Sequence, residues 1–191
     1  MESKHERLRK SFRTVGLFAA LIFVYLVWAI PFRVMVVIPG FTEIRPVQLL
    51  KPVYGVFFGI PGCLAFAVGN LIGDCLSDSL KWSSIAGFAA NFVGPFVFWL
   101  FWNRLSKTPF ALRDGKDLLK QLAVTAVSAA LEALLITPFV MLAYTDVDAM
   151  LFAATVFLNG SVFPLLLGIP LMILMQEEFG FRPRTVRRVP R

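Results

Sequence analysis

The chain is poor in the side chains that most often carry metal-dependent or nucleophilic chemistry. Its single histidine, His5, lies in a charged N-terminal stretch, which excludes both a histidine-based metal site and a Ser-His-Asp triad. Its two cysteines, Cys63 and Cys75, fall on one predicted helix, ~18 Å apart and too distant for a disulfide. The sequence has no G-x-x-x-x-G-K-[ST] loop for a nucleotide phosphate. We therefore expect neither an enzyme nor a bound cofactor or metal.

Charged residues are also scarce. They make up 16% of the 191 residues, whereas 58% are hydrophobic, and soluble proteins carry roughly a quarter charged residues. This composition predicts an integral membrane protein. The formal net charge of +7 is concentrated at the chain ends and in one connection, so membrane topology explains it better than nucleic-acid binding does.

The apolar runs predict an all-α membrane protein, a bundle of six transmembrane helices. The first run has no A-x-A cleavage pattern and is too long for a signal peptide, so we expect it to be retained. The second run rises only ~21 Å, short of the ~30 Å hydrocarbon core, so it must tilt, lie inside protein or border water. The predicted helices occupy about 14–39, 46–59, 61–76, 85–102, 118–144 and 149–175.

The distribution of basic residues predicts the orientation. Six spans place the basic leader (1–13), a tight turn at Pro61, a basic loop and the basic tail (177–191) on one side of the membrane domain (14–176). By the positive-inside rule that side is cytoplasmic. We therefore expect a multi-pass protein of the bacterial cell (cytoplasmic) membrane with both termini in the cytoplasm. The loop carries Arg104, Lys107, Arg113, Lys116 and Lys120.

Several predicted helices carry polar residues at membrane depth. Such residues usually face a bundle interior or a water-filled cavity. Glu132 gives the sharpest signal, because a buried carboxylate needs a cation, a hydrogen-bond network or a proton. Its alternative role is structural, satisfied by the hydroxyls of Ser128 or Thr137, and a lone Asn can equally serve an interhelical hydrogen bond. The candidate substrate-binding residues are Glu43, Arg45, Gln48, Lys51, Asn70, Asp74, Asn91, Glu132 and Asn159.

Small residues recur four apart on the same helices and predict close helix packing. Gly55 and Gly59 form one such pair, and Ala65, Gly69 and Gly73 form a longer row.

Three segments carry a resemblance to a known family: TEIRP, GVFFGIPGCLAFAVGNLIGD and AGFAANFVGP. Together they resemble the membrane substrate-binding (S) components of energy-coupling factor (ECF) transporters, most closely queuosine-precursor-like or uncharacterised members. The six-helix plan covers nearly the whole chain, but the specific part runs from Glu43 to Pro95.

The resemblance implies a small capture protein whose pocket opens outward, between the first outer loop and helices four to six. The segment Glu43 to Lys51 would cap that pocket. A transmembrane coupling (T) subunit and two cytoplasmic ATPase subunits would be its partners, with toppling in the membrane to release a micronutrient-like small molecule. Gly16 and Ala20 match the small pair of the first helix that contacts the coupling subunit, although the first member here is glycine instead of alanine.

Two other functions compete with transport. A structural or scaffold membrane protein without a ligand is the stronger alternative. A lipid-headgroup phosphotransferase is disfavoured, because the spacing of Gly69, Asp74 and Asp78 does not fit the motif and its partner aspartates are missing. The sequence leaves the charge of the substrate open.

Overall fold

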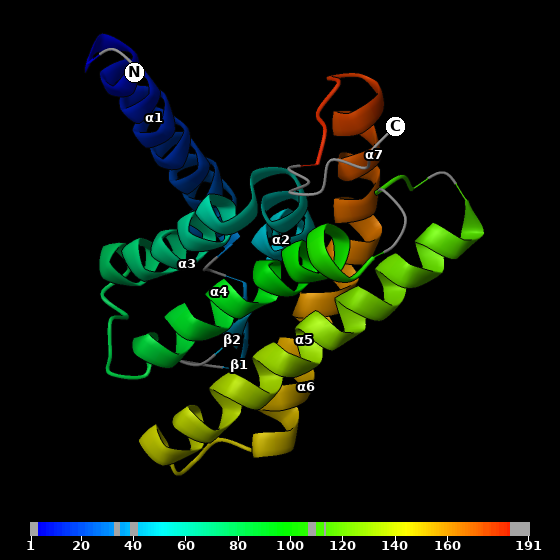
Figure 1. Cartoon of the computed structure of the whole chain (residues 1–191). Coiled ribbons are helices and arrows are strands. Elements are labelled where there is room, and N and C mark those ends of the chain that lie inside the picture. Colours follow the sequence, from blue (N-terminus) through cyan, green and yellow to red (C-terminus); the bar gives the residue numbers. More distant parts are fainter. Residues whose placement is uncertain (1–3, 33–34, 39–41, 107–109, 113, 184–191) are drawn as a thin grey trace.

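The computed structural model describes residues 4–32, 35–38, 42–106, 110–112 and 114–183, without the side chains of 4–5, 7–10, 36–38 and 42–43. Within these ranges the regular structure is helical apart from one short antiparallel hairpin (Figure 1), which confirms the all-α expectation. The elements are α1 (Lys4–Ala29), η1 (Ile30–Phe32), β1 (Val36–Ile38), β2 (Thr42–Glu43), η2 (Pro46–Leu49), α2 (Leu50–Val53), η3 (Tyr54–Phe58), α3 (Gly59–Leu76), α4 (Ser84–Leu100), η4 (Phe101–Leu105), α5 (Gly115–Ala143), α6 (Ala149–Phe163), η5 (Pro164–Gly168) and α7 (Ile169–Glu177).

Five helical stretches in the described part are long and apolar enough to cross a membrane. Four of them have 22 to 29 residues, more than the ~20 that span a hydrocarbon core, and the fifth, of 31 residues, is folded back on itself as described below. The chain therefore has the composition and helix lengths of a membrane protein. The stretches are Ser11–Phe32, Pro46–Leu76, Ser84–Leu105, Gly115–Ala143 and Ala149–Glu177.

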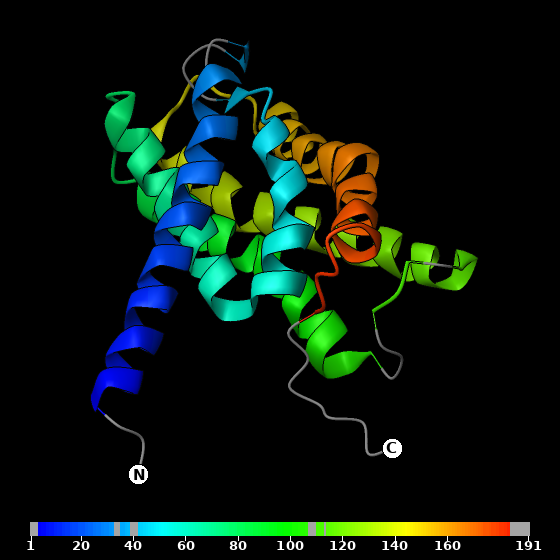
Figure 2. The same cartoon turned by 90° about the horizontal axis from the view of Figure 1, so that it is seen from above.

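The second of these stretches reverses direction at Gly59. That residue has φ 65° and ψ −145°, a conformation that glycine tolerates and other residues rarely adopt. The rings of Tyr54 and Phe66 lie 5.7 Å apart, although a straight helix would separate them by ~18 Å. The two halves therefore lie side by side as a hairpin (Figure 2). The prediction of a turn at Pro61 was two residues late, because Gly59 supplies the bend and Pro61 falls in the first turn of α3, where a missing N–H is harmless.

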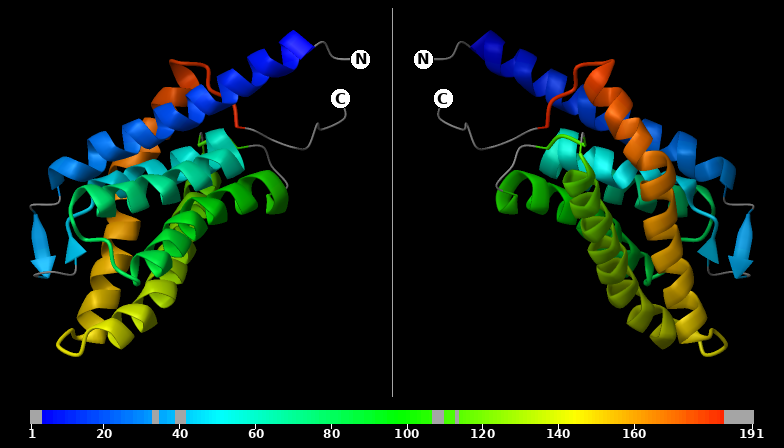
Figure 3. Two further views of the ribbon diagram at one scale, coloured as in Figure 1. Left: turned by 90° about the vertical axis from the view of Figure 1, so that its left-hand side faces the viewer. Right: turned by 90° about the vertical axis from the view of Figure 1, so that its right-hand side faces the viewer.

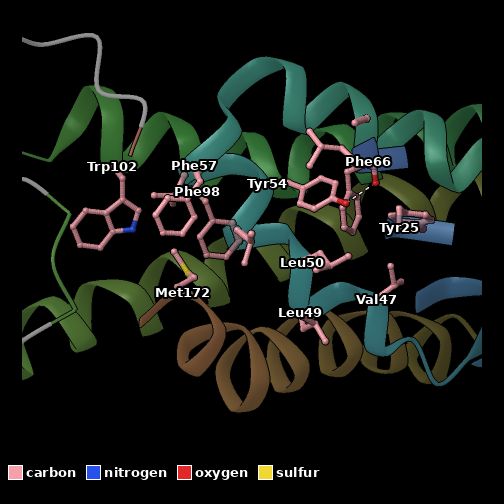
Figure 4. Close-up of a cluster of buried hydrophobic side chains, with 14 of the residues drawn as sticks. Tyr25, Val47, Leu49, Leu50, Tyr54, Phe57, Phe66, Phe98, Trp102 and Met172 are labelled. Carbon is pink, nitrogen blue, oxygen red and sulfur yellow. Dashed lines mark hydrogen bonds between the residues drawn. The ribbon is translucent and has the colours of Figure 1, made fainter. Parts of the chain in front are cut away.

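The first half of this hairpin forms the centre of the protein. Every residue from Pro46 to Phe57 is buried, so of the three possibilities for the short second run, the structure shows that it lies inside protein. Its own Tyr54 packs with aromatic and aliphatic side chains of the neighbouring helices, including Phe66 and Phe98 (Figure 4). The Tyr54 hydroxyl donates to the Leu21 carbonyl at 2.6 Å and thereby satisfies its polar group within the core.

Helix α1 is the least enclosed of the membrane-capable stretches. Only 17% of its most apolar window is buried, against 61% for Pro46–Leu76, and its N-terminal half extends beyond the other helices (Figures 1 and 2). It begins at Lys4, so most of the basic leader is helical. It ends at Ala29, before Pro31, because proline cannot donate the hydrogen bond that would continue the helix.

Helices α5 and α6 form a V whose arms meet at the short turn between them (Figure 3). Each helix begins with an aspartate cap that satisfies a free backbone N–H. Asp114 accepts from the Asp117 N–H at 2.7 Å, and Asp148 accepts from the Leu151 N–H at 2.7 Å. The two caps fix where the polar connections stop and the apolar spans begin.

Glycines permit close contacts between the central hairpin and its neighbours, as the small-residue rows predicted. A side chain at Gly55 would overlap the Pro95 carbonyl oxygen of α4, and one at Gly69 would lie 2.7 Å from the Tyr25 ring of α1. Both contacts need a residue without Cβ, so these glycines set the helix spacing.

We expect Gly55→Val to lower the free energy of unfolding by about 1–3 kcal/mol, as overpacking does in other cores. The new side chain would have to displace α4, since Phe98 Cβ also lies 3.1 Å from the position of the added Cβ. Denaturant unfolding in detergent micelles measures the loss. Gly16→Val is the matched control, because a Cβ at Gly16 meets nothing within 4 Å; equal losses for both variants would contradict the packing argument.

Candidate functional site

The centre of the bundle holds an ion pair between Lys51 of α2 and Glu132 of α5. The Lys51 side chain is fully buried and Glu132 is 4% exposed. A buried carboxylate needs a cation, a hydrogen-bond network or a proton, and the structure shows that the Glu132 carboxylate is paired with a cation, Lys51. The hydroxyls proposed as alternative partners do not serve this purpose: Ser128 donates to the Gly94 carbonyl at 3.0 Å, and Thr137 Oγ1 has no hydrogen-bond partner among the described residues.

Two glycines make room for this pair. A Cβ at Gly94 of α4 would overlap Glu132 Oε1 and lie 3.2 Å from Lys51 Cδ, and a Cβ at Gly160 of α6 would lie 3.2 Å from Lys51 Nζ. The lysine chain therefore passes from the central hairpin between three outer helices. A side chain at either glycine would close the space that the ion pair occupies.

A second polar cluster forms around Arg45, at the entrance to η2. Its guanidinium donates from Nη2 to Asn70 Oδ1 at 2.6 Å, and its backbone N–H donates to Asn159 Oδ1 at 2.9 Å. The Tyr25 hydroxyl also donates to Asn70 Oδ1, at 3.2 Å. This cluster joins α1, α3 and α6 to the hairpin entrance. Arg45 precedes Lys51 by six residues on the same segment of the hairpin, so we refer to the cluster and the ion pair together as the polar region.

The other predicted site residues differ in how far they join this region. Asp74 is half-buried on α3 and accepts a long contact of 3.5 Å from Asn70 Nδ2. Gln48 is buried on η2, between Arg45 and Lys51 in sequence. Asn91 is buried on α4, but its amide donates to the Gly87 carbonyl of its own helix at 2.7 Å, which fits a structural role. The Glu43 backbone belongs to β2, and its side chain lies outside the described part.

The predicted partner-binding residues lie apart from the polar region. Gly16 and Ala20 are both exposed on α1, the helix that extends from the bundle (Figure 1). Their exposure leaves a strip of small residues open to lipid or to another helix.

Sequence reasoning did not identify Tyr25 as part of the polar region. The sequence signal for this role was one tyrosine in an otherwise apolar run. That signal is weak, because tyrosine is common in membrane helices. It also did not connect Gly94 and Gly160 with Lys51. That connection depends on how three helices pack and has no signature in local sequence.

Comparisons with known proteins add no assignment: no protein-family model, curated protein or solved structure matches the chain. Across the described residues, no group of three His, Cys, Asp or Glu side chains is placed to hold a metal ion.

We expect the ion pair to be essential for stability. Lys51→Met or Glu132→Met alone should lower the free energy of unfolding by about 3–5 kcal/mol, because each leaves an uncompensated buried charge. The double variant should lose much less than the sum of the two, since no charge is then left unpaired. Denaturant unfolding of the wild-type protein, the two single variants and the double variant in lipid nanodiscs measures these losses as a double-mutant cycle. Additive losses would show that the two side chains do not stabilise each other.

Proposed function

We propose that this protein is the substrate-capture membrane subunit of an importer of the ECF type. In this proposal six spans place both termini in the cytoplasm, with the central hairpin counted as two spans. The polar region around Arg45 binds a small micronutrient-like molecule from the outer side. A transmembrane coupling subunit and two cytoplasmic ATPase subunits then drive release, without covalent chemistry in this chain.

One observation carries the proposal: the half-buried Arg45 meets the buried Asn70 and Asn159, which come from two other elements. The partial exposure of Arg45 matters, because a ligand has to reach the site before the surrounding apolar walls exclude water. The neighbouring ion pair supports the same proposal, since fixed charges at membrane depth are costly and usually serve a function.

A ligand-free scaffold is the second candidate, and one feature favours it. Lys51 and Glu132 pair with each other in a space shaped by glycines, which is the arrangement expected if the charges only fix how the helices pack. The two functions differ in whether the purified protein binds a solute.

Arg45→Ala tests the binding site. We expect the wild-type protein in nanodiscs to retain a small molecule from a bacterial metabolite extract, detected by mass spectrometry, and the variant to retain about tenfold less, because a hydrogen bond to a charged group is lost. Arg104→Ala is the matched control, since Arg104 lies over the Trp99 ring with 5.6 Å to the centroid, away from the site. Retention of no solute by the wild-type protein would favour the scaffold.

Gly16→Leu tests the partner surface. We expect this variant to bind solute normally but to reduce uptake about tenfold in cells that contain the coupling subunit, because a bulky side chain prevents close helix approach. Ala19→Leu adds similar bulk to α1 beside the Gly16–Ala20 strip and should preserve uptake. Unchanged uptake by the Gly16 variant would remove this surface from the proposal.

A further inference from the structure

The last membrane-capable stretch, Ala149–Glu177, changes its hydrogen-bond pattern in the middle (Figure 1). Helix α6 passes into the π-helix η5, at whose end the Ile169 N–H donates to the Pro164 carbonyl, five residues back instead of four. Pro164 has no N–H to donate, so the Gly160 carbonyl loses the partner that a regular helix would give it. Helices kink at prolines and π-helical turns, because the hydrogen-bond ladder is interrupted there. The middle of this span is therefore where it bends most easily.

The half of the span after η5 is fixed to the central hairpin. A Cβ at Gly168 would lie 2.8 Å from the Leu49 carbonyl oxygen and 3.1 Å from Pro52 Cγ, so the two backbones are in close contact. Met172 of α7 is fully buried in the hydrophobic core. This half cannot turn without disturbing the centre of the protein.

The half before η5 begins at an exposed end, where Met150 is 84% exposed. It packs on α5, and near η5 that contact is made by small residues. A Cβ at Gly160 would lie 3.0 Å from Ala129 Cβ of α5. Small residues at a helix contact have no long side chains that interlock, so α6 can slide along α5 by the shear motion that packed helices allow.

One hydrogen bond joins this half of the span to the entrance of the hairpin. Asn159 Oδ1 accepts from the Arg45 backbone N–H at 2.9 Å, and Asn159 lies five residues before Pro164, ~7.5 Å along the helix. A bend of ~20° at η5 would move Asn159 by ~2.6 Å, enough to break the hydrogen bond. The same bend would move the start of α6, which is 15 residues long, by ~8 Å.

We infer that α6 (Ala149–Phe163) is a gate that turns about η5, and that the hydrogen bond from Arg45 to Asn159 is the latch that holds this gate closed. Opening the latch frees the Arg45 backbone N–H from α6, whereas the bond from the Arg45 guanidinium to Asn70 lies outside the moving part. In the proposed function the open gate admits the solute to the polar region. That purpose rests on the proposed function, but the motion itself does not.

The test measures the distance between two spin labels by electron paramagnetic resonance, with the full-length protein in nanodiscs. One label is attached to the native Cys75, which is exposed on α3, and the other to Met150→Cys at the start of α6. Cys63 is buried and stays unlabelled. In this labelled background we expect one main distance, that of the closed gate.

Asn159→Ala should add a second population, displaced by up to ~8 Å, because the acceptor of the latch is lost. Pro164→Ala combined with Asn159→Ala should remove that population, since an alanine at this position can donate the N–H that makes the span a regular helix.

Asn91→Ala is the matched control. Asn91 is also a buried asparagine of a membrane-capable helix, but its amide donates to the Gly87 carbonyl of the same helix. This variant should keep the distance distribution of the labelled background. Asn159→Asp keeps an acceptor for the Arg45 N–H and should also stay closed. If Asn159→Ala does not fold, Pro164→Ala alone gives a second measurement, because a stiffer span should narrow the distribution.

Each part of the inference has an outcome that would overturn it. An unchanged distribution in Asn159→Ala would exclude the latch. A second population that persists after Pro164→Ala is added, or an unchanged width in Pro164→Ala alone, would exclude η5 as the point of rotation. These measurements need no solute, so they are independent of capture: a protein whose gate moves but which retains no solute would contradict the proposed function alone.

Discussion

The ion pair between Lys51 and Glu132 is the interaction on which the rest of the structure depends. A short helix with a fully buried lysine can occupy the centre of a bundle only if a counter-charge meets it there, because an unpaired buried charge is costly. Helix α5 supplies the carboxylate, so the position of α5 relative to the hairpin follows from this requirement. The glycines of α4 and α6 then leave room for the pair.

The central hairpin explains why a short apolar run occurs in this protein. Inside the bundle, its length does not have to match the thickness of a bilayer, because its neighbours are protein side chains. Its reversal depends on Gly59, the one glycine of the hairpin with a positive φ. Close packing on Tyr25 and Pro95 through Gly69 and Gly55 holds the hairpin between α1 and α4. Arg45 and Lys51 of the hairpin then contact the other helices.

Much of the fold was accessible from the sequence, because helix formation and hydropathy are local properties. Apolar length predicted where α4, α5 and α6 begin to within three residues. The rows of small residues correctly indicated close contacts at Gly55 and Gly69. The first helix was predicted to end near residue 39, but α1 ends at Ala29. The prediction was too long because the apolar run continues past Pro31 into the segment that contains β1.

The candidate site was predictable as a set of residues but not as a set of contacts. Composition and the lengths of the apolar runs by themselves determined that the chain is helical and suited to a membrane, and that its few buried polar residues had to find partners. Tertiary structure decided that Glu132 pairs with Lys51, which lies 81 residues away in sequence, and that Asn91 bonds to its own helix. Partner choice depends on which atoms come within hydrogen-bond distance, and packing in three dimensions sets those distances.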